Sequence, residues 1–62
     1  MAHRAEIHQA TGFLSVKASV GMTEALLLLR AHAFAADRSL LDVARDVLAG
    51  RLRIHPEESE DD

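Results

Sequence analysis

A chain of 62 residues without cysteine forms one small domain at most, and it excludes disulfides and thiolate metal sites. No apolar run reaches the roughly 18–20 residues of a membrane span, and the first ten residues lack the apolar region of a secretory signal, so we expect a cytoplasmic protein without membrane contact. The net charge of −3 is uneven: residues 1–54 hold all seven Lys and Arg and five acidic side chains, whereas residues 55–62 add five more acids.

Helix-forming residues dominate the composition, and two phenylalanines, three glycines and one proline leave little from which to build strands. Apolar side chains recur at three- and four-residue spacing in three segments, separated by turns of a few residues. Short turns make neighbouring helices pack directly on each other. We therefore expect an all-α fold, a compact three-helix bundle over residues 4–54, followed by a disordered acidic tail over residues 55–62.

The first helix is expected over residues 5–20, with Gly21 as the residue that ends it. Its apolar face consists of Ile7, Ala10, Leu14 and Ala18, widened by Phe13, Val16 and Val20. Gly12 lies mid-helix, where glycine costs about 1 kcal/mol against alanine. It either lets another backbone come close or is simply tolerated at an exposed position.

The second helix is expected to begin with Thr23 as its N-cap and to run to Ala36. Its apolar stripe consists of Ala25, Leu26, Leu29, Ala33 and Phe34. Leu27 and Leu28 lie outside this stripe, so the helix is apolar around more than half of its girth. Such a helix lies in the middle of a bundle or buries a second face, which makes Leu27 and Leu28 a candidate dimer or partner surface.

After a turn at residues 37–38, Ser39 opens the third helix, and Asp42 three residues later completes a short-acid version of the capping box. The apolar face of this helix consists of Leu40, Val43, Ala44, Val47 and Leu48. Gly50 is positioned to end the helix, unless residues 51–54 prolong it by another turn. Pro56 disfavours helix at the preceding residue, and the acids beyond it are too polar to fold.

The sequence offers no catalytic residue and no cofactor or metal site. The four histidines do not pair at the i, i+3 or i+4 spacing that puts two ligands on one helix face: His3, His8, His32 and His55. No serine lies in a nucleophile motif, and no glycine-rich phosphate loop is present. We therefore expect neither an enzyme nor a small-molecule substrate.

The basic side chains are the better lead, because the planar fork of arginine suits phosphates and guanine edges. Lys17, Arg30, Arg38 and Arg45 are distributed over the three expected helices and the second turn. On composition alone, a solvated charged face with a few ion pairs, such as Asp42 with Arg45, explains them better than a binding site does.

The order of residues adds a resemblance. Three pieces occur at short, compatible spacings, namely IHQATGFLSVK, EALLLLRAHA and RSLLDVARDV. Together they resemble the ANTAR family, the RNA-binding output domains of bacterial transcription antitermination regulators. The matching positions are Ile7, Gln9, Ala10, Gly12, Leu14, Ala25, Leu29, Arg30, Ala33, Arg38, Leu40, Val43 and Ala44. The chain departs from the family pattern at Thr11, where lysine is frequent, and at Lys17, where arginine is frequent.

The resemblance implies a domain that binds paired stem-loops in nascent mRNA leaders, prevents terminator formation and is controlled through dimerisation. It also implies a sensor domain, a phosphoacceptor receiver or GAF, in the parent protein. The candidate RNA-binding residues are Gln9, Gly12, Lys17, Arg30, Arg38 and Arg45. Among these, Gln9 can read a base edge or cap a backbone group, and Arg30 and Arg38 can bind phosphate or stack beneath a loop base. Lys17 and Arg45 would add sequence-independent attraction, and Gly12 would let RNA or a neighbouring helix come close.

Two other functions remain open from the residues. The second and third helices could form a helix-turn-helix that binds DNA, with Arg45 and Asp46 as its readers. Alternatively, the chain could be a homodimerisation or protein-interaction module without RNA affinity, built on Leu27 and Leu28.

Overall fold

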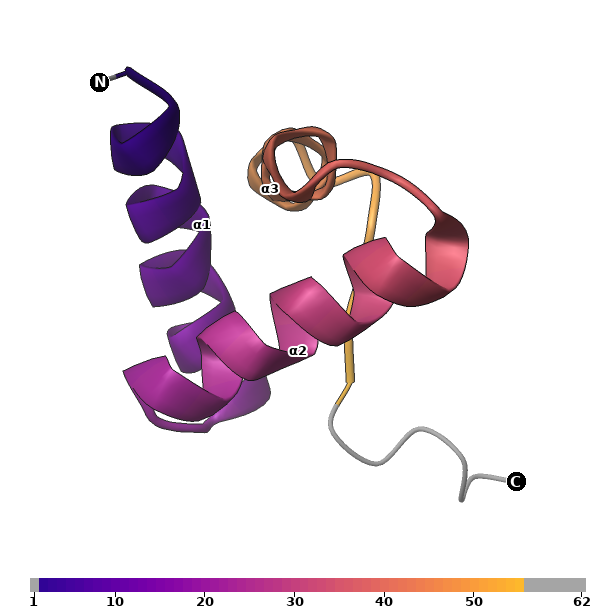
Figure 1. Cartoon of the computed structure of the whole chain (residues 1–62). Helices are drawn as coiled ribbons and strands as arrows, with labels where there is room; N and C mark the ends of the chain where they lie inside the picture. The colour runs from indigo at the N-terminus through magenta and orange to yellow at the C-terminus, as the bar shows by residue number, and fades with distance from the viewer. Residues whose placement is uncertain (1, 56–62) are drawn as a thin grey trace.

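The computed structural model describes residues 2–55, with side chains from Arg4 onward. It contains three helices, α1 (Ala2–Ala18), α2 (Met22–Ala36) and α3 (Leu40–Leu48), and the described residues contain no strand. The chain direction turns by 106° between α1 and α2, and α3 packs against both (Figure 1). The all-α three-helix fold is therefore confirmed. The expected disordered tail lies, apart from His55, outside the described residues.

The core is built from small and branched side chains of all three helices. The buried residues are Ala10, Leu14, Ala25, Leu29, Ala33, Val43, Ala44 and Val47. Four of them are alanines, and small side chains at the contacts let helix axes come close. The helical periodicity predicted all eight of these positions. Five other residues expected on the apolar faces are only half-buried, namely Ile7, Ala18, Val20, Leu26 and Leu40, and Leu48 is 37% exposed.

The outer face of α2 differs from the prediction. Phe34 was expected in the core stripe but is 90% exposed, because it lies one residue beyond buried Ala33 and so points 100° away from it. Leu27 is 59% exposed, whereas Leu28 is half-buried and packs against the core. On α1, Phe13 and Val16 are exposed as well and do not widen the core face.

The helix ends follow one backbone pattern, and only one of the three uses glycine. At the end of α1, Ser19 has φ 58°, its N–H donates to the carbonyl of Val16, and the N–H of Val20 donates to that of Ser15. Asp37 has φ 57° after α2, and Gly50 has φ 79° after α3, with equivalent bonds. This is the Schellman motif, which satisfies the last carbonyls of a helix.

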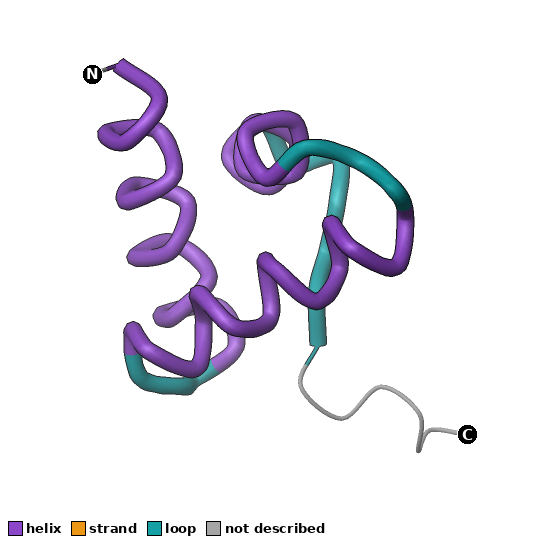
Figure 2. The backbone as a smooth tube through the Cα atoms, viewed as in Figure 1, coloured by secondary structure: helices purple, strands orange, loops and turns teal. Residues whose placement is uncertain are grey.

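Two predicted caps are therefore wrong. Gly21 does not end α1, since Ser19 does, and Gly21 instead occupies the N-cap position of α2 where Thr23 was expected. The N-cap of α3 is confirmed, because the backbone N–H of Asp42 donates to Ser39 Oγ at 3.0 Å. Gly50 ends α3 as expected, and residues 51–55 do not prolong the helix but continue as a loop (Figure 2).

Candidate nucleic-acid interface

Among the described residues, ion pairs engage three of the seven Lys and Arg side chains, and we refer to Arg38, Arg45 and Arg51 as the paired arginines. Arg38 Nη1 and Arg51 Nη2 lie 2.6 and 3.0 Å from the two carboxylate oxygens of Asp46. Arg45 reaches from α3 to α1, where its Nε and Nη2 donate to the two oxygens of Glu6 at 3.2 Å each. The predicted partner of Arg45, Asp42, is therefore wrong.

These ion pairs shift the ionisation of their members. Hydrogen bonds from Arg38 and Arg51 hold the pKa of Asp46 below its usual range. The hydrogen bond to Glu6 raises the pKa of Arg45. Both shifts favour the charged forms, and each paired arginine already uses one or two of its N–H donors on a carboxylate that offsets its charge.

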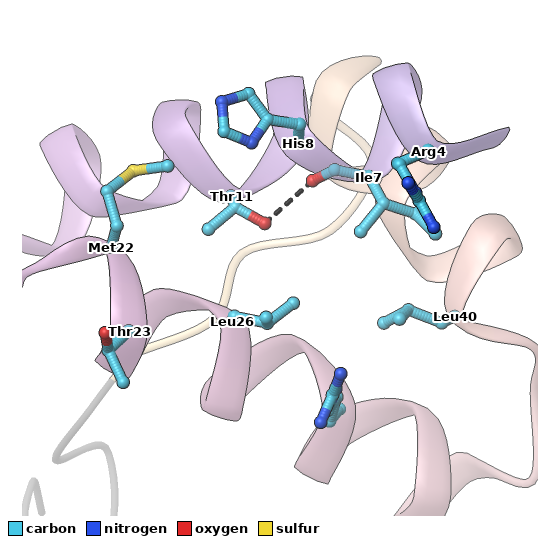
Figure 3. Close-up of a pocket in the computed structure, with 9 residues that line it drawn as sticks. Arg4, Ile7, His8, Thr11, Met22, Thr23, Leu26 and Leu40 are labelled. Carbon is cyan, nitrogen blue, oxygen red and sulfur yellow. Dashed lines mark hydrogen bonds between the residues drawn. The ribbon is translucent and has the colours of Figure 1, made fainter. Parts of the chain in front are cut away.

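An open groove of about 650 Å³ lies between α1 and α2, and we call it the α1–α2 groove. One wall belongs to α1 and the other to α2, and a leucine of α3 lies at one end (Figure 3). The lining residues are Arg4, Ile7, His8, Thr11, Met22, Thr23, Leu26, Arg30 and Leu40. Apolar side chains therefore form much of its surface, and two arginines, an imidazole and two hydroxyls supply polar groups.

Arg4 and Arg30 come from opposite walls of the groove and are both exposed. Within the described residues, neither forms an ion pair. Each guanidinium thus keeps all five of its N–H donors for an external acceptor. One arginine on each side of an apolar surface suits a ligand that has phosphates at its edge and flat, apolar faces between them.

Thr11 is the buried polar residue of the groove, with 4% of its surface exposed. Its hydroxyl donates to the carbonyl of Ile7, one turn earlier, at 2.7 Å (Figure 3). This bond satisfies the hydroxyl within α1, so Thr11 shapes the groove and contributes no charge to it.

The structure brings only one of the six candidate RNA residues, Arg30, into this groove. Gln9 and Gly12 lie on the outer side of α1, and no other atom lies within 4 Å of a Cβ built on Gly12. Gly12 therefore does not admit another helix of this chain. Lys17 lies elsewhere, with its Nζ 5.6 Å from the ring centre of Phe13, and Arg38 and Arg45 are paired.

Sequence reasoning missed Arg4 and His8 as groove residues. Their spacing contained a usable signal, because positions 4, 7, 8 and 11 recur at i, i+3, i+4 and i+7 and so share one face of a helix. The position of the second wall, in contrast, depends on the angle between α1 and α2.

Within the described residues, no three His, Asp or Glu side chains are placed to hold a metal ion. No single described helix is long and apolar enough to cross a membrane. Residues 4–18 and α2 together have the length and apolar composition of a membrane span, but the two segments are bent by 106° relative to each other.

Comparison with known proteins gives one match. The family model described as ANTAR domain matches residues 1–48, which include all three helices. No curated protein and no solved structure matches the chain significantly.

Proposed function

The chain belongs to the ANTAR domain family, known as RNA-binding antitermination output domains, and from this membership we propose that it binds paired stem-loops in nascent mRNA leaders. Binding there would disfavour the terminator hairpin and let the polymerase continue. Hairpin loops suit a small protein because their bases are unstacked, unlike those of an A-form stem.

One observation supports the α1–α2 groove as the RNA-binding surface. Arg30, which belongs to the ANTAR-like pattern, lies exposed opposite Arg4 and without an ion pair among the described residues. The paired arginines lack this freedom. Arg4 and Arg30 would bind the backbone phosphates, and the apolar surface around Ile7 and Leu26 would lie against a loop base.

Binding of the purified chain to a leader RNA with two adjacent stem-loops tests this proposal. Single stem-loop RNA and duplex DNA serve as controls, each at two salt concentrations, because phosphate contacts weaken with salt. The Arg30→Ala variant should lose about tenfold in affinity for the paired RNA. The matched variant Arg45→Ala removes the same charge from a paired arginine and should lose far less. Equal losses, or equal affinity for all three nucleic acids, would refute the proposal.

Self-association is the second proposal, and an exposed apolar stripe on α2 favours it. Leu27 and Phe34 lie two turns apart on the same outer face, with exposed Ala31 between them. Two copies that pack antiparallel about this stripe would place Leu27 of each against Phe34 of the other, an isologous contact. The same symmetry would put both Arg30 side chains on one face of the dimer. Two stem-loops would then bind as a bivalent ligand.

Sedimentation of the chain over a range of concentrations checks the dimer. Phe34→Gln should shift the equilibrium towards monomer, whereas Val16→Gln should not, because Val16 is an apolar position on α1 that is 78% exposed and lies outside this stripe. A concentration-independent monomer would refute this second proposal and leave RNA binding untouched. In the parent protein, a receiver or GAF sensor would act by controlling this association.

The helix-turn-helix alternative receives less support. Its two candidate readers on α3 are both held in ion pairs, Arg45 with Glu6 and Asp46 with Arg38 and Arg51. The duplex DNA control would favour this alternative only if it bound more tightly than the paired stem-loops.

A further inference from the structure

A second hollow, separate from the α1–α2 groove, lies between the C-terminal half of α1 and the loop after α3. Its volume is about 340 Å³. Buried Leu14 and Val47 lie at its base, and Phe13, Lys17, Arg53 and His55 supply its aromatic and basic groups. We call it the C-terminal pocket. It uses residues beyond position 48, where the family match ends.

The backbone at Gly50 explains why this pocket exists. Its φ of 79° belongs to the left-handed region, which glycine enters without the penalty of a Cβ. The N–H of Arg51 then donates to the carbonyl of Asp46 at 2.9 Å, which closes α3 and redirects the chain. Leu52 and Ile54 pack against the core and anchor the segment. Arg53, which lies between them, and His55, which follows them, then line the pocket.

An exposed aromatic ring beside cations is the chemical feature of this pocket. Phe13 is 41% exposed, although it is one of only two aromatic side chains in the chain. Lys17 Nζ lies 5.6 Å from its ring centre, a cation–π distance. Among the described residues, neither Lys17 nor Arg53 forms an ion pair, so both cations can meet an anion.

We propose that the C-terminal pocket binds an unpaired nucleobase and its neighbouring phosphate. The base would stack on the ring of Phe13, and Lys17 and Arg53 would hold the phosphate. Stacking on an aromatic side chain and a basic groove along the backbone are the two elements with which proteins bind single-stranded nucleic acid. This inference rests on the proposed RNA-binding function and extends its surface to residues that the family match does not include.

The absence of tryptophan and tyrosine from the chain permits a direct test. Phe13→Trp introduces a single fluorophore that keeps a stacking surface, and Phe34→Trp places the same fluorophore at the other phenylalanine, on the outer face of α2. Each variant is titrated with ten-nucleotide oligoadenylate and with the paired stem-loop RNA. The pocket predicts saturable quenching of Phe13→Trp that exceeds the quenching of Phe34→Trp.

Affinity measurements complete the test. Phe13→Ala should weaken oligoadenylate binding about tenfold. Arg53→Gln should weaken it more than Arg51→Gln, since Arg51 is held by Asp46. Circular dichroism of each variant confirms that the helices remain.

The outcomes separate this inference from the proposed function. The wild type could bind the paired stem-loops while RNA fails to quench the fluorescence of Phe13→Trp and Phe13→Ala keeps its affinity for oligoadenylate. The pocket would then be refuted and the proposed function would stand. If the paired stem-loops do not bind but oligoadenylate quenches Phe13→Trp selectively, the pocket is supported and the proposed function fails.

Discussion

The paired arginines and the arginines of the α1–α2 groove are the same side chain in two different electrostatic settings. Arg38 and Arg51 share Asp46, and Arg45 is held by both oxygens of Glu6. Arg4 and Arg30, on opposite walls of the groove, have no such partner among the described residues. An arginine that already pairs with a carboxylate gains less from a phosphate, because the carboxylate offsets its charge and uses part of its N–H donors. Exposure alone therefore does not identify a nucleic-acid-binding arginine.

Removal of each set of arginines in turn should have the largest effect on RNA affinity. The double variant Arg4→Ala/Arg30→Ala should lose about a hundredfold in affinity for the paired stem-loops, with a salt slope reduced by about 2. Arg45→Ala/Arg51→Ala, with the same net charge, should lose about fivefold. Filter binding over a salt series measures both quantities. Similar losses would mean that net charge governs binding and that the groove has no special role.

Addition of a cation to the groove should change RNA affinity in the opposite direction and raise it. Thr11 lines the groove at a position where the ANTAR-like pattern often has lysine. Thr11→Lys should tighten binding of the paired RNA about tenfold, because its ammonium would join Arg4 and Arg30. Ala35→Lys adds the same charge at an exposed position of α2 outside the groove, and it should gain about twofold at most. Equal gains in the same binding assay would contradict a localised site.

Releasing the paired arginines is the next smaller change. Asp46→Asn removes the carboxylate that holds Arg38 and Arg51, so RNA affinity should rise about threefold, more than in Glu24→Gln.

The thermal stability of the protein should respond to pH through the same carboxylate. The folded-state pKa of Asp46 is depressed, so its contribution is present above the ordinary value of 3.8 and is lost as pH falls below it. Thermal melts should therefore show a smaller loss on acidification below pH 4 in Asp46→Asn than in the wild type; parallel losses would exclude this role.

The acidic residues after position 55 should produce the smallest effect. Five acids follow the basic part of the chain and can compete with RNA for its cations. Deletion of residues 57–62 should tighten RNA binding about twofold at low salt and leave it unchanged at high salt, where such long-range attraction is screened. An unchanged affinity at low salt would remove this competition.

Much of the fold was predictable from local pattern. The apolar spacing placed the three helices and all eight buried core residues, since period 3.6 decides which side chains share a face. It also placed Phe34 and Leu48 in the core, and both are exposed. Ser39 was predictable as a cap because its hydroxyl acts on a backbone N–H three residues away. Ser19 was not predictable as the residue that ends α1, because a non-glycine residue with positive φ is uncommon. The Schellman motif at Ser19 also depends on where the next helix starts.

The helical class and the buried faces follow from residues within a few turns of one another, and the family follows from their order along residues 1–48. Which cations stay available depends instead on tertiary packing. Arg45 donates to Glu6, which lies 39 positions away in the chain. Arg30 lies opposite Arg4 in a groove whose two walls are set by the angle between α1 and α2. Periodicity reports the direction of a side chain around its own helix, but the partner that it meets depends on how separate helices pack.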